Sequence, residues 1–294
     1  MKYVIGLDIG GTKIHSIVAE WDKNLLRTRR LPKVVKSNRV ALQNKKDGDK
    51  FFKEVTAEIH SLIEEFGEKN VERIGVGIAG PLSRDKVSLP SPNLPLKNFP
   101  TLKKLEENFN FPIFVDNDAN CFTWAEHLFG AAAAASSTVG VTLGTGVGGG
   151  IVLDRDGEAF LWDGYHGGAA EIGHMILDGE RSFEDLCSSR SQYLWKGRDP
   201  MAIEQEARAG NKEYQDVYKK FGFWLGVGVA NVVNVLNPEV VVIGGSISNA
   251  WPLFEKEMHK SVYKYILSTQ AKKTKIVRAK LGDDAGALGA AYLI

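Results

Sequence analysis

Short apolar runs that end in glycine or in acidic residues recur along this 294-residue chain. Residues 3–7 and 14–21 are two such runs on either side of a glycine turn, a pattern that predicts strand, turn and strand. Residues 139–143 and 151–153 flank a second glycine turn in the same way. Because the same figure opens each half of the chain, we expect a duplicated structural unit.

The segments between these runs have the spacing of helices and buried strands. Apolar side chains recur at helical intervals from residue 50 to residue 66, and Gly67 follows as a stop. Strands are expected at residues 74–78, 112–115 and 240–243, and helices at residues 119–129, 221–236 and 283–293. The alternation of strands and helices predicts an α/β protein.

Length and composition favour a globular protein with two lobes. A chain of 294 residues is too long for one ordinary core, so two lobes that share a cleft are expected. The net charge is only +1, which leaves no basic excess for a nucleic acid partner. The basic run at residues 27–36 is interpreted as a solvated strand edge or loop.

Cysteine use and hydropathy predict a cytoplasmic protein with no membrane association. Only Cys121 and Cys187 occur, and no secretory leader precedes them, so a disulfide framework is not expected. The longest apolar stretch, residues 221–236, is interrupted by Asn231 and Asn234 and is shorter than the ~18 apolar residues of a membrane span. We interpret it as a buried helix whose small residues let another element approach closely.

The two glycine turns carry candidate phosphate-binding chemistry. They comprise Gly10, Gly11, Thr12 and Lys13 in the first half and Gly144, Thr145 and Gly146 in the second. Backbone N–H groups can point at phosphate oxygens where a β-carbon is missing, and several of these glycines are expected at positive φ. Either turn alone is typical of an ordinary hairpin, but the pair favours a nucleotide site. No helix follows either turn, which excludes a Walker loop and disfavours a dinucleotide fold.

Two aspartates follow predicted strands and offer carboxylates for catalysis. Asp8 ends the first strand and could hold Mg²⁺ directly or through water. Asp118 follows the strand at residues 112–115, where a carboxylate that accepts a hydroxyl proton would orient the attacking oxygen in phosphoryl transfer. The alternative is that Asp116, Asn117 or Asp118 caps the next helix, a contribution of ~1 kcal/mol.

A glycine-rich segment at residues 164–168 leads to Glu171 and His174, which are three positions apart. This spacing brings a carboxylate and an imidazole within reach of one ligand. Carboxylates accept paired hydroxyl donors, which is how proteins hold sugars. The alternative is that both groups lie on the surface or in a satisfied local network.

Taken together, these motifs resemble the ROK family of repressors, open reading frames and sugar kinases, within the actin-like, ribonuclease H-like ATPase superfamily. The resemblance covers nearly the whole chain and rests on residues 8–13, 79–81, 93–95, 116–120, 143–150, 171–174, 237–239, 244–245 and 281–290. It implies two actin-like lobes with a duplicated core around an interlobe cleft, ATP and Mg²⁺ as cofactors, and a homodimer. The N-terminal lobe would span residues 1–117 and be completed by a C-terminal helix at 284–294, and the second lobe would span residues 118–283.

The resemblance also implies roles for individual residues. Asp118 corresponds to the catalytic base of the family, and Asn117, Glu171 and His174 correspond to residues that bind sugar hydroxyls. The same comparison places Gly80 and Asn93 at the sugar pocket, Glu184 on the sugar, and Gly244 and Gly245 beside the adenine and ribose.

Two departures from the family pattern concern the sugar site. Many members hold a zinc ion between the histidine of the Glu-x-Gly-His motif and three cysteines after it, but only Cys187 follows His174 here. Four ligands cannot be assembled, so no zinc site is expected and His174 should be oriented by hydrogen bonds. Ala170 stands where the family usually has glycine, and its methyl group is able to tilt Glu171.

The resulting prediction is an ATP-dependent kinase for a hexose, with glucose first and fructose, mannose or an N-acetylated hexosamine as alternatives. Polyphosphate is an alternative donor. A sugar-sensing repressor is one rival, but such proteins carry a winged helix-turn-helix before the kinase-like lobes, whereas the first glycine turn here begins at Asp8. An actin-like or chaperone-type ATPase is the other rival, and sugar-dependent release of ADP separates the two.

Overall fold

The computed structural model describes residues 1–91, 93–156, 158–168 and 170–294. The chain divides into two compact units, which we describe separately. Unit 1 contains the described residues of 1–134, 161–168 and 280–294, and unit 2 contains those of 135–160 and 170–279. Each unit is built on one five-stranded sheet.

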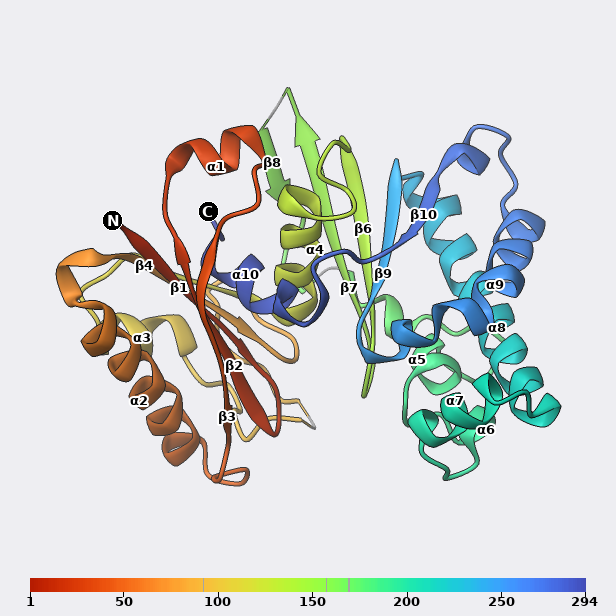
Figure 1. Ribbon diagram of the computed structural model, residues 1–294, viewed down its shortest axis with the longest axis horizontal. Helices are drawn as coiled ribbons and strands as arrows, with labels where there is room; N and C mark the ends of the chain where they lie inside the picture. The colour runs from red at the N-terminus through yellow and green to blue at the C-terminus, as the bar shows by residue number, and fades with distance from the viewer. Residues whose placement is uncertain (92, 157, 169) are drawn as a thin grey trace. The chain divides into compact units, whose positions relative to one another are not determined.

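The sheet of unit 1 has the strand order β3-β2-β1-β4-β5 (Figure 1). Its strands are β1 (Tyr3–Ile9), β2 (Lys13–Glu20), β3 (Val34–Ala41), β4 (Val71–Ile78) and β5 (Ile113–Asn117). Strand β2 runs antiparallel to its neighbours β1 and β3, while β4 and β5 are parallel to β1. The carboxyl ends of β1, β4 and β5 therefore lie at the same edge of the sheet.

The two faces of this sheet are covered by different helices, as Figure 1 shows. Ile5, Leu7 and Ile9 alternate along β1 and share one apolar core with the buried face of α2 (Gly48–Phe66). This is the helix expected at residues 50–66, and it ends at Gly67, whose φ of 81° suits a glycine. The shorter helices α1 (Lys23–Thr28) and α3 (Thr101–Asn108) also belong to unit 1.

Glycines let the helices α4 (Asp118–Phe129) and α10 (Ala285–Ala291) lie directly on the opposite face. A β-carbon on Gly75 of β4 would be 1.7 Å from the carbonyl oxygen of Ala290, and one on Gly289 would be 1.7 Å from that of Cys121. No side chain fits at such distances, so the glycines are required for packing. The C-terminal helix is rich in alanine and glycine for the same reason.

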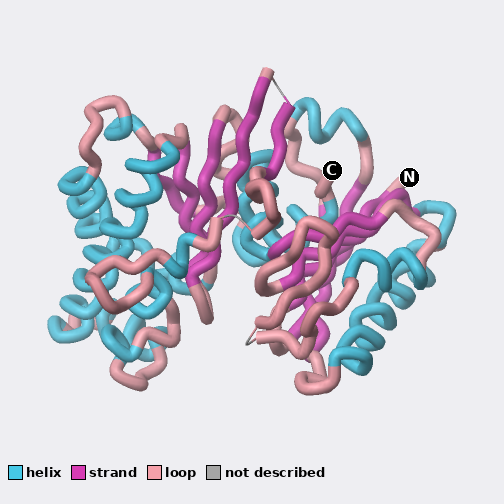
Figure 2. Tube along the Cα trace, turned by 180° about the vertical axis from the view of Figure 1, so that it is seen from behind, coloured by secondary structure: helices cyan, strands magenta, loops and turns pink. Residues whose placement is uncertain are grey.

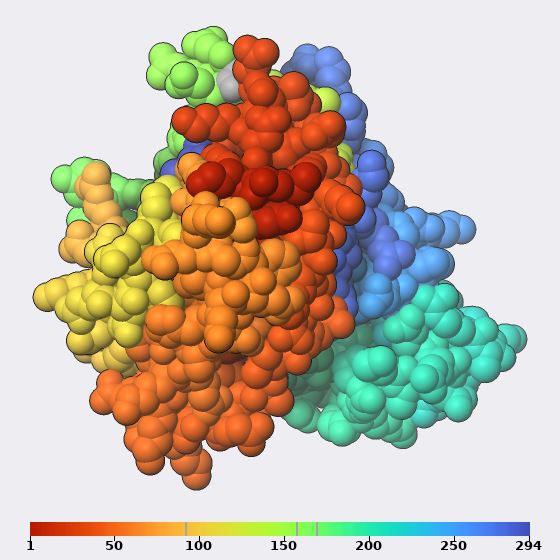
Figure 3. All heavy atoms as spheres, turned by 60° about the vertical axis from the view of Figure 1, so that its left-hand side comes forward, coloured from red at the N-terminus to blue at the C-terminus, as the bar shows by residue number. Residues whose placement is uncertain are grey.

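The outer surface of unit 1 is seen in Figure 3, where the N-terminal residues in dark red adjoin the orange residues that follow α2. Lys2 Nζ donates a hydrogen bond to the carbonyl oxygen of Lys69 at 3.1 Å and lies 3.5 Å from Glu72 Oε2. These contacts tie the start of β1 to the short turn before β4.

Unit 2 repeats the topology of unit 1. Its strands are β6 (Ser137–Leu143), β7 (Val147–Arg155), β8 (Glu158–Leu161), β9 (Val240–Gly244) and β10 (Lys275–Arg278), in the order β10-β9-β6-β7-β8. In both units an antiparallel hairpin is followed by parallel strands on one side. The duplication predicted from the two glycine turns is thus confirmed.

The long helix α8 (Lys212–Leu236) contains the apolar stretch that the sequence predicts to be a buried helix. It packs against α9 (Trp251–Tyr265), and β-carbons on Gly222 and Gly226 would lie 2.5 Å from the carbonyl oxygens of Phe254 and Met258. Figure 2 shows these helices as the outer layer of unit 2. The remaining helices of this unit are α5 (Phe183–Cys187), α6 (Gln192–Trp195) and α7 (Pro200–Arg208).

Among the described residues, no helix has both the length and the apolar character needed to cross a bilayer.

The boundary between the units differs from the expected one. The contacts divide the chain after residue 134 and not after residue 117, because α4 packs against α10 and the sheet of unit 1. Residues 161–168 also belong to unit 1, although they lie between strands of unit 2 in the sequence. The C-terminal residues 280–294 lie in unit 1, the lobe to which the sequence assigns the C-terminal helix.

Candidate active site

Unit 1 gathers three carboxylates near the carboxyl ends of its parallel strands. Asp8 of β1, Gly77 of β4 and Asp116 of β5 are register partners in one row across the sheet. A β-carbon on Gly77 would lie 3.1 Å from Cys121 Sγ, so this row faces α4. Burial first, and then the charges of Asp116, Asp8 and Asp118, raise the pKa of the Cys121 thiol well above its usual value. Asp118 and Asp8, which were predicted from separate motifs, are therefore both close enough to influence the buried Cys121 thiol.

Asp118 is the first residue of α4, and it is half-buried. Its Oδ1 accepts a hydrogen bond from the backbone N–H of Ala119 at 2.9 Å. The positive end of the helix dipole favours the ionised form of a carboxylate at this place. The Asp118 carboxylate is therefore partly exposed at the end of the helix that favours negative charge.

Asn117 resolves the capping alternative, because it is the cap of α4. Its Oδ1 accepts hydrogen bonds from the N–H groups of Ala119 at 2.9 Å and Asn120 at 3.4 Å. Its Nδ2 donates to the carbonyl oxygen of Gly80 at 2.9 Å. Both ends of the Asn117 amide are engaged by the protein, so the side chain is held in one orientation beside Asp118.

Gly80 and Asn93 lie on the connection that follows β4. Gly80 has a φ of 99°, and a β-carbon there would be 2.8 Å from Ser91, so only glycine fits. The Asn93 side chain is exposed, and its backbone carbonyl faces Gly11, where a β-carbon would be 2.5 Å away. The first glycine turn and the predicted sugar-binding residues of unit 1 are thus brought together.

In the two glycine turns, Gly11 and Gly146 are set by close neighbours and not by a left-handed backbone, while Gly10 and Gly144 have room for a β-carbon. In the first, Gly10 N–H donates to the carbonyl of Lys13 at 3.1 Å, and in the second, Gly144 N–H donates to that of Gly146 at 3.0 Å. None of Gly10, Gly11, Gly144 and Gly146 has a positive φ, so that expectation was wrong. Gly11 and Gly146 are instead constrained by close neighbours, a backbone carbonyl and the carboxylate of Glu184.

Asp8 has a perturbed acidity. Its burial raises the pKa to about 6, and the nearby charge of Lys13 opposes this shift. A β-carbon on Gly286 of α10 would be 2.6 Å from Asp8 Oδ2, so the helix closes over this carboxylate. Near neutral pH Asp8 is ionised, and burial of this charge lowers the free energy of unfolding.

Replacing Asp8 by asparagine is therefore expected to raise the free energy of unfolding by about 1 to 3 kcal/mol near neutral pH. The folded protein protonates Asp8 below about pH 6 and the unfolded chain only below about pH 4. The gain of the Asp8→Asn variant over wild type should shrink as the pH falls through that window. Urea unfolding at both ends of the window, without divalent cations, measures it. Asp85→Asn, at an exposed position, is the control, and an Asp8 effect that does not change with pH would contradict the prediction.

In unit 2, Glu184 is attached to the second glycine turn. The Val147 N–H donates to Glu184 Oε2 at 2.9 Å, and a β-carbon on Gly146 would lie 2.3 Å from the same oxygen. The Ser189 N–H donates to the carbonyl oxygen of Gly144 at 2.7 Å. Helix α5 and the segment after it therefore contact the turn, and the charge of Glu184 acts on Glu171.

Glu171 precedes a single turn of 3₁₀ helix that ends at His174, and their side chains are 48% and 73% exposed. Glu171 Oε2 and His174 Nε2 are 3.9 Å apart. Partial burial, opposed by His174 and reinforced by Glu184, raises the pKa of Glu171. The two exposed groups can meet one ligand, as their spacing predicts.

Ala170 adopts a left-handed backbone, with a φ of 67°. This conformation favours glycine, which is the residue that the family usually has at this position. The carbonyl of Ala170 also lies close to Gly149 of β7, where a β-carbon would be 2.4 Å away. The turn that carries Glu171 is thus pressed against the strand after the second glycine turn.

Gly244 ends β9 next to the end of β6, and Gly245 follows the strand. Gly244 pairs with Thr142, and Gly245 has a φ of 83°. A β-carbon on Gly245 would lie 2.3 Å from the carbonyl oxygen of Leu143, the residue before the second glycine turn. These two glycines and that turn therefore lie at one edge of the sheet.

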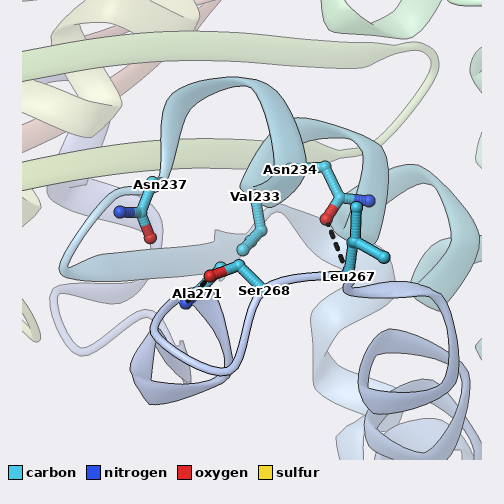
Figure 4. A pocket seen from close by; sticks show the side chains of 6 residues that line it. All are labelled: Val233, Asn234, Asn237, Leu267, Ser268 and Ala271. Carbon is cyan, nitrogen blue, oxygen red and sulfur yellow. Dashed lines mark hydrogen bonds between the residues drawn. The ribbon is translucent and has the colours of Figure 1, made fainter.

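A pocket elsewhere in unit 2 lies between the end of α8 and the segment after α9 (Figure 4). It is lined by Val233, Asn234, Asn237, Leu267, Ser268 and Ala271. None of these side chains is ionisable, and none belongs to the predicted site. This pocket therefore offers no ionisable side chain for proton transfer.

Comparison with known proteins identifies the family. The family model described as "ROK family" matches residues 4–294. The chain belongs to the ROK family. An N-acetyl-D-glucosamine kinase of Vibrio cholerae is 32% identical over 98% of both chains. The xylose repressor of Bacillus subtilis is 24% identical over 99% of this chain and 77% of the repressor.

The fold is that of solved ROK structures. A crystal structure of a ROK family glucokinase from Streptomyces griseus, in complex with glucose and AMPPNP, is 26% identical and covers 98% of each chain with a TM-score of 0.82. The predicted α/β fold with two duplicated, actin-like lobes is thus confirmed for this member of the ROK family.

The zinc-binding positions of this ROK protein differ from the family pattern described above. Cys187 is fully buried in the core of unit 2, and burial raises the pKa of its thiol. Within the described part of the chain, no group of three His, Cys, Asp or Glu side chains could hold a metal ion. His174 Nε2 lies 3.9 Å from Glu171 Oε2, which is too far for a hydrogen bond, so the hydrogen bonds expected to orient His174 are not found among the described residues.

Sequence reasoning missed Lys86 and the role of Asp116. The Lys86 ammonium group donates to Asp116 Oδ2 at 2.8 Å, next to the ROK family's Asn-Asp pair. Lys86 lies in an irregular connection, 30 positions before its partner, and no local pattern links the two. Only the tertiary structure reveals the pair formed by Lys86 and Asp116.

Proposed function

We propose that this protein is an ATP- and Mg²⁺-dependent hexose kinase whose first acceptor is glucose, which it converts to glucose 6-phosphate. The observation that carries the proposal is Asp118 at the start of α4, close to Asp8 and beside a fully oriented Asn117. Relatives that are a glucokinase and an N-acetyl-D-glucosamine kinase support a hexose acceptor. Fructose, mannose and N-acetylated hexosamines are the alternatives.

In this proposal Asp118 is the general base. Its carboxylate accepts the proton of the sugar hydroxyl as that oxygen bonds to the γ-phosphorus, and the bond from phosphorus to the bridging oxygen of ADP breaks. The proton ends on Asp118 and the phosphoryl group on the sugar. The ionised form of the carboxylate is the one that accepts the proton, and the dipole of α4 favours negative charge at this end of the helix.

The two glycine turns are proposed to bind the nucleotide. N–H groups and hydroxyls of Gly10–Thr12 and Gly144–Gly146, with Lys13, would contact phosphates, and Gly244 and Gly245 would border the adenine and ribose. A single hard carboxylate suits Mg²⁺, which takes its other ligands from water and phosphates, so Asp8 fits such an ion. The ion would neutralise charge on the phosphates.

The residues proposed to bind sugar hydroxyls are those that the family resemblance names. In unit 1 they are Asn93, Asn117 and the neighbourhood of Gly80, and in unit 2 they are Glu171, His174 and Glu184. Carboxylates and amides that bond sugar hydroxyls reject molecules without those hydroxyls. The homodimer remains a prediction from the family resemblance, and the cytoplasmic location remains one from cysteine use and hydropathy.

A coupled assay of ADP release over a panel of hexoses tests the proposal. We expect turnover that requires both ATP and a hexose and is fastest with glucose. Replacement of ATP by polyphosphate tests the alternative donor. Sugar binding with no release of ADP would instead indicate a sensor, and ADP release without any sugar would indicate an ATPase of another kind.

A further inference from the structure

Lys86 forms a shielded ion pair next to the proposed catalytic base. Its ammonium group donates to Asp116 Oδ2 at 2.8 Å, and the two side chains are only 23% and 12% exposed. It also lies 3.9 Å from Asp163 Oδ2. Ion pairs in such surroundings are screened far less than surface pairs, so removing one partner has a large effect.

The carboxylate of Asp116 connects this lysine to the start of α4. Its Oδ1 accepts hydrogen bonds from the Asn117 N–H and from Asn120 Nδ2, both at 2.7 Å. Asn117 and Asn120 flank Asp118 in the sequence, on the two sides of the first helical turn. The direction in which the Asp118 side chain leaves the backbone therefore depends on how Asp116 is held.

The backbone of Lys86 gives independent evidence that its side chain matters. Lys86 has a φ of 55°, in the left-handed region that glycine occupies without strain. It closes a turn in which its N–H donates to the carbonyl of Ser83 at 2.9 Å. A lysine in this conformation is less stable than glycine unless its side chain contributes something.

The same turn also contacts residues 161–168. A β-carbon on Gly167 would lie 2.9 Å from the backbone nitrogen of Arg84, and the Arg84 guanidinium lies 6.0 Å from the ring centre of Tyr165. With Asp163 beside Lys86, three contacts attach this segment to the turn. Lys86 is thus bonded to the base of α4 and lies against the segment that leads to Glu171.

We propose that Lys86 is a positioning residue of the phosphoryl-transfer site, which acts through Asp116 to fix Asn117 and Asp118 for the sugar hydroxyl. The inference rests on the proposed function. Without the ammonium group, Asp116 would keep a shielded negative charge near those of Asp8 and Asp118 and would hold Asn117 and Asn120 less firmly. Errors of about 1 Å in the placement of a reacting group cost on the order of a hundredfold in rate.

Three substitutions at this position test the proposal. We expect Lys86→Met and Lys86→Gly to lower kcat by about tenfold to a hundredfold and to raise KM for the hexose, with KM for ATP changed by less than about twofold. Lys86→Arg keeps the charge and should restore kcat to within about threefold of wild type. Lys104→Met is the matched control, because it removes a lysine from an exposed ion pair of the same unit.

Two measurements distinguish an effect of Lys86 on folding from an effect on the positioning of the site. Lys86→Gly removes the backbone strain as well as the ion pair, so its melting temperature should stay close to that of wild type while its kcat falls. Hydrogen exchange at the N–H groups of Ala119 and Asn120 should become faster in Lys86→Met and Lys86→Gly but not in Lys86→Arg or Lys104→Met.

Some outcomes would overturn the inference. Wild-type kcat in Lys86→Met, or an arginine variant as impaired as the methionine variant, would show that the ammonium group does not position the site. If the wild-type protein phosphorylates no hexose, the proposed function fails, and hydrogen exchange at Ala119 and Asn120 still decides whether Lys86 orders the start of α4.

Discussion

Replacing Asp118 by asparagine should lower kcat for hexose phosphorylation by about a thousandfold, because general base catalysis contributes roughly 10² to 10⁴ in rate. The amide has the same shape as the carboxylate and its oxygen can still accept the hydrogen bond from Ala119 N–H, so the helix should keep its structure. It cannot accept the hydroxyl proton. Sugar binding, which also uses other residues, should remain detectable.

Steady-state kinetics and isothermal titration with the best hexose of the panel measure these two effects. Asp85→Asn, which makes the same change at an exposed position of the same unit, should behave like wild type. Substantial turnover by Asp118→Asn would reject the assigned role. Loss of sugar binding together with turnover would assign Asp118 to binding instead of proton transfer.

Glu126→Ala is expected to be among the most destabilising single substitutions in unit 1. Glu126 is fully buried in α4, where its Oε2 accepts the N–H of Ala131 at 2.7 Å. Its Oε1 accepts the N–H groups of Lys280 at 2.9 Å and Leu281 at 2.8 Å. Removing the carboxylate leaves three backbone donors without their acceptor, each at a cost of about 1 kcal/mol or more, so we expect a loss of about 3 kcal/mol or more.

Urea unfolding followed by circular dichroism measures this loss. Glu126→Gln keeps one side-chain oxygen and should fall between wild type and the alanine variant. Glu106→Ala, on the exposed face of α3, should have little effect. A change of less than about 1 kcal/mol in Glu126→Ala would mean that water replaces the carboxylate at these donors.

The strands and the long helices could be predicted because their signals are local. Alternation and glycine stops placed β1, β2, β6, β7 and α2 within a few residues of their observed bounds. The edge strand β3 and the short helix α1 were missed, since a half-exposed strand with a basic start and a six-residue helix of mixed polarity resemble loops. Their structure depends on neighbours that a local pattern does not contain.

The boundary between the units and the reason for the glycines also required the structure. Helix α4 follows the expected boundary in the sequence, yet its contacts with α10 assign it to unit 1. A glycine in a turn suggests positive φ, but whether φ or space makes it necessary depends on what lies nearby. Only the packed neighbours, Asn93 beside Gly11 and Glu184 beside Gly146, decide this.

The sequence by itself determined the family, the duplicated hairpins and the residues that carry the candidate chemistry, because short motifs specify backbone turns and reactive groups locally. The tertiary structure alone decided which groups hold those residues in place. Lys86 and Asp116 are 30 positions apart, and Glu126 and Lys280 are 154 apart. Bonds over such separations form only when burial brings distant segments together, so no pattern along the chain can reveal them.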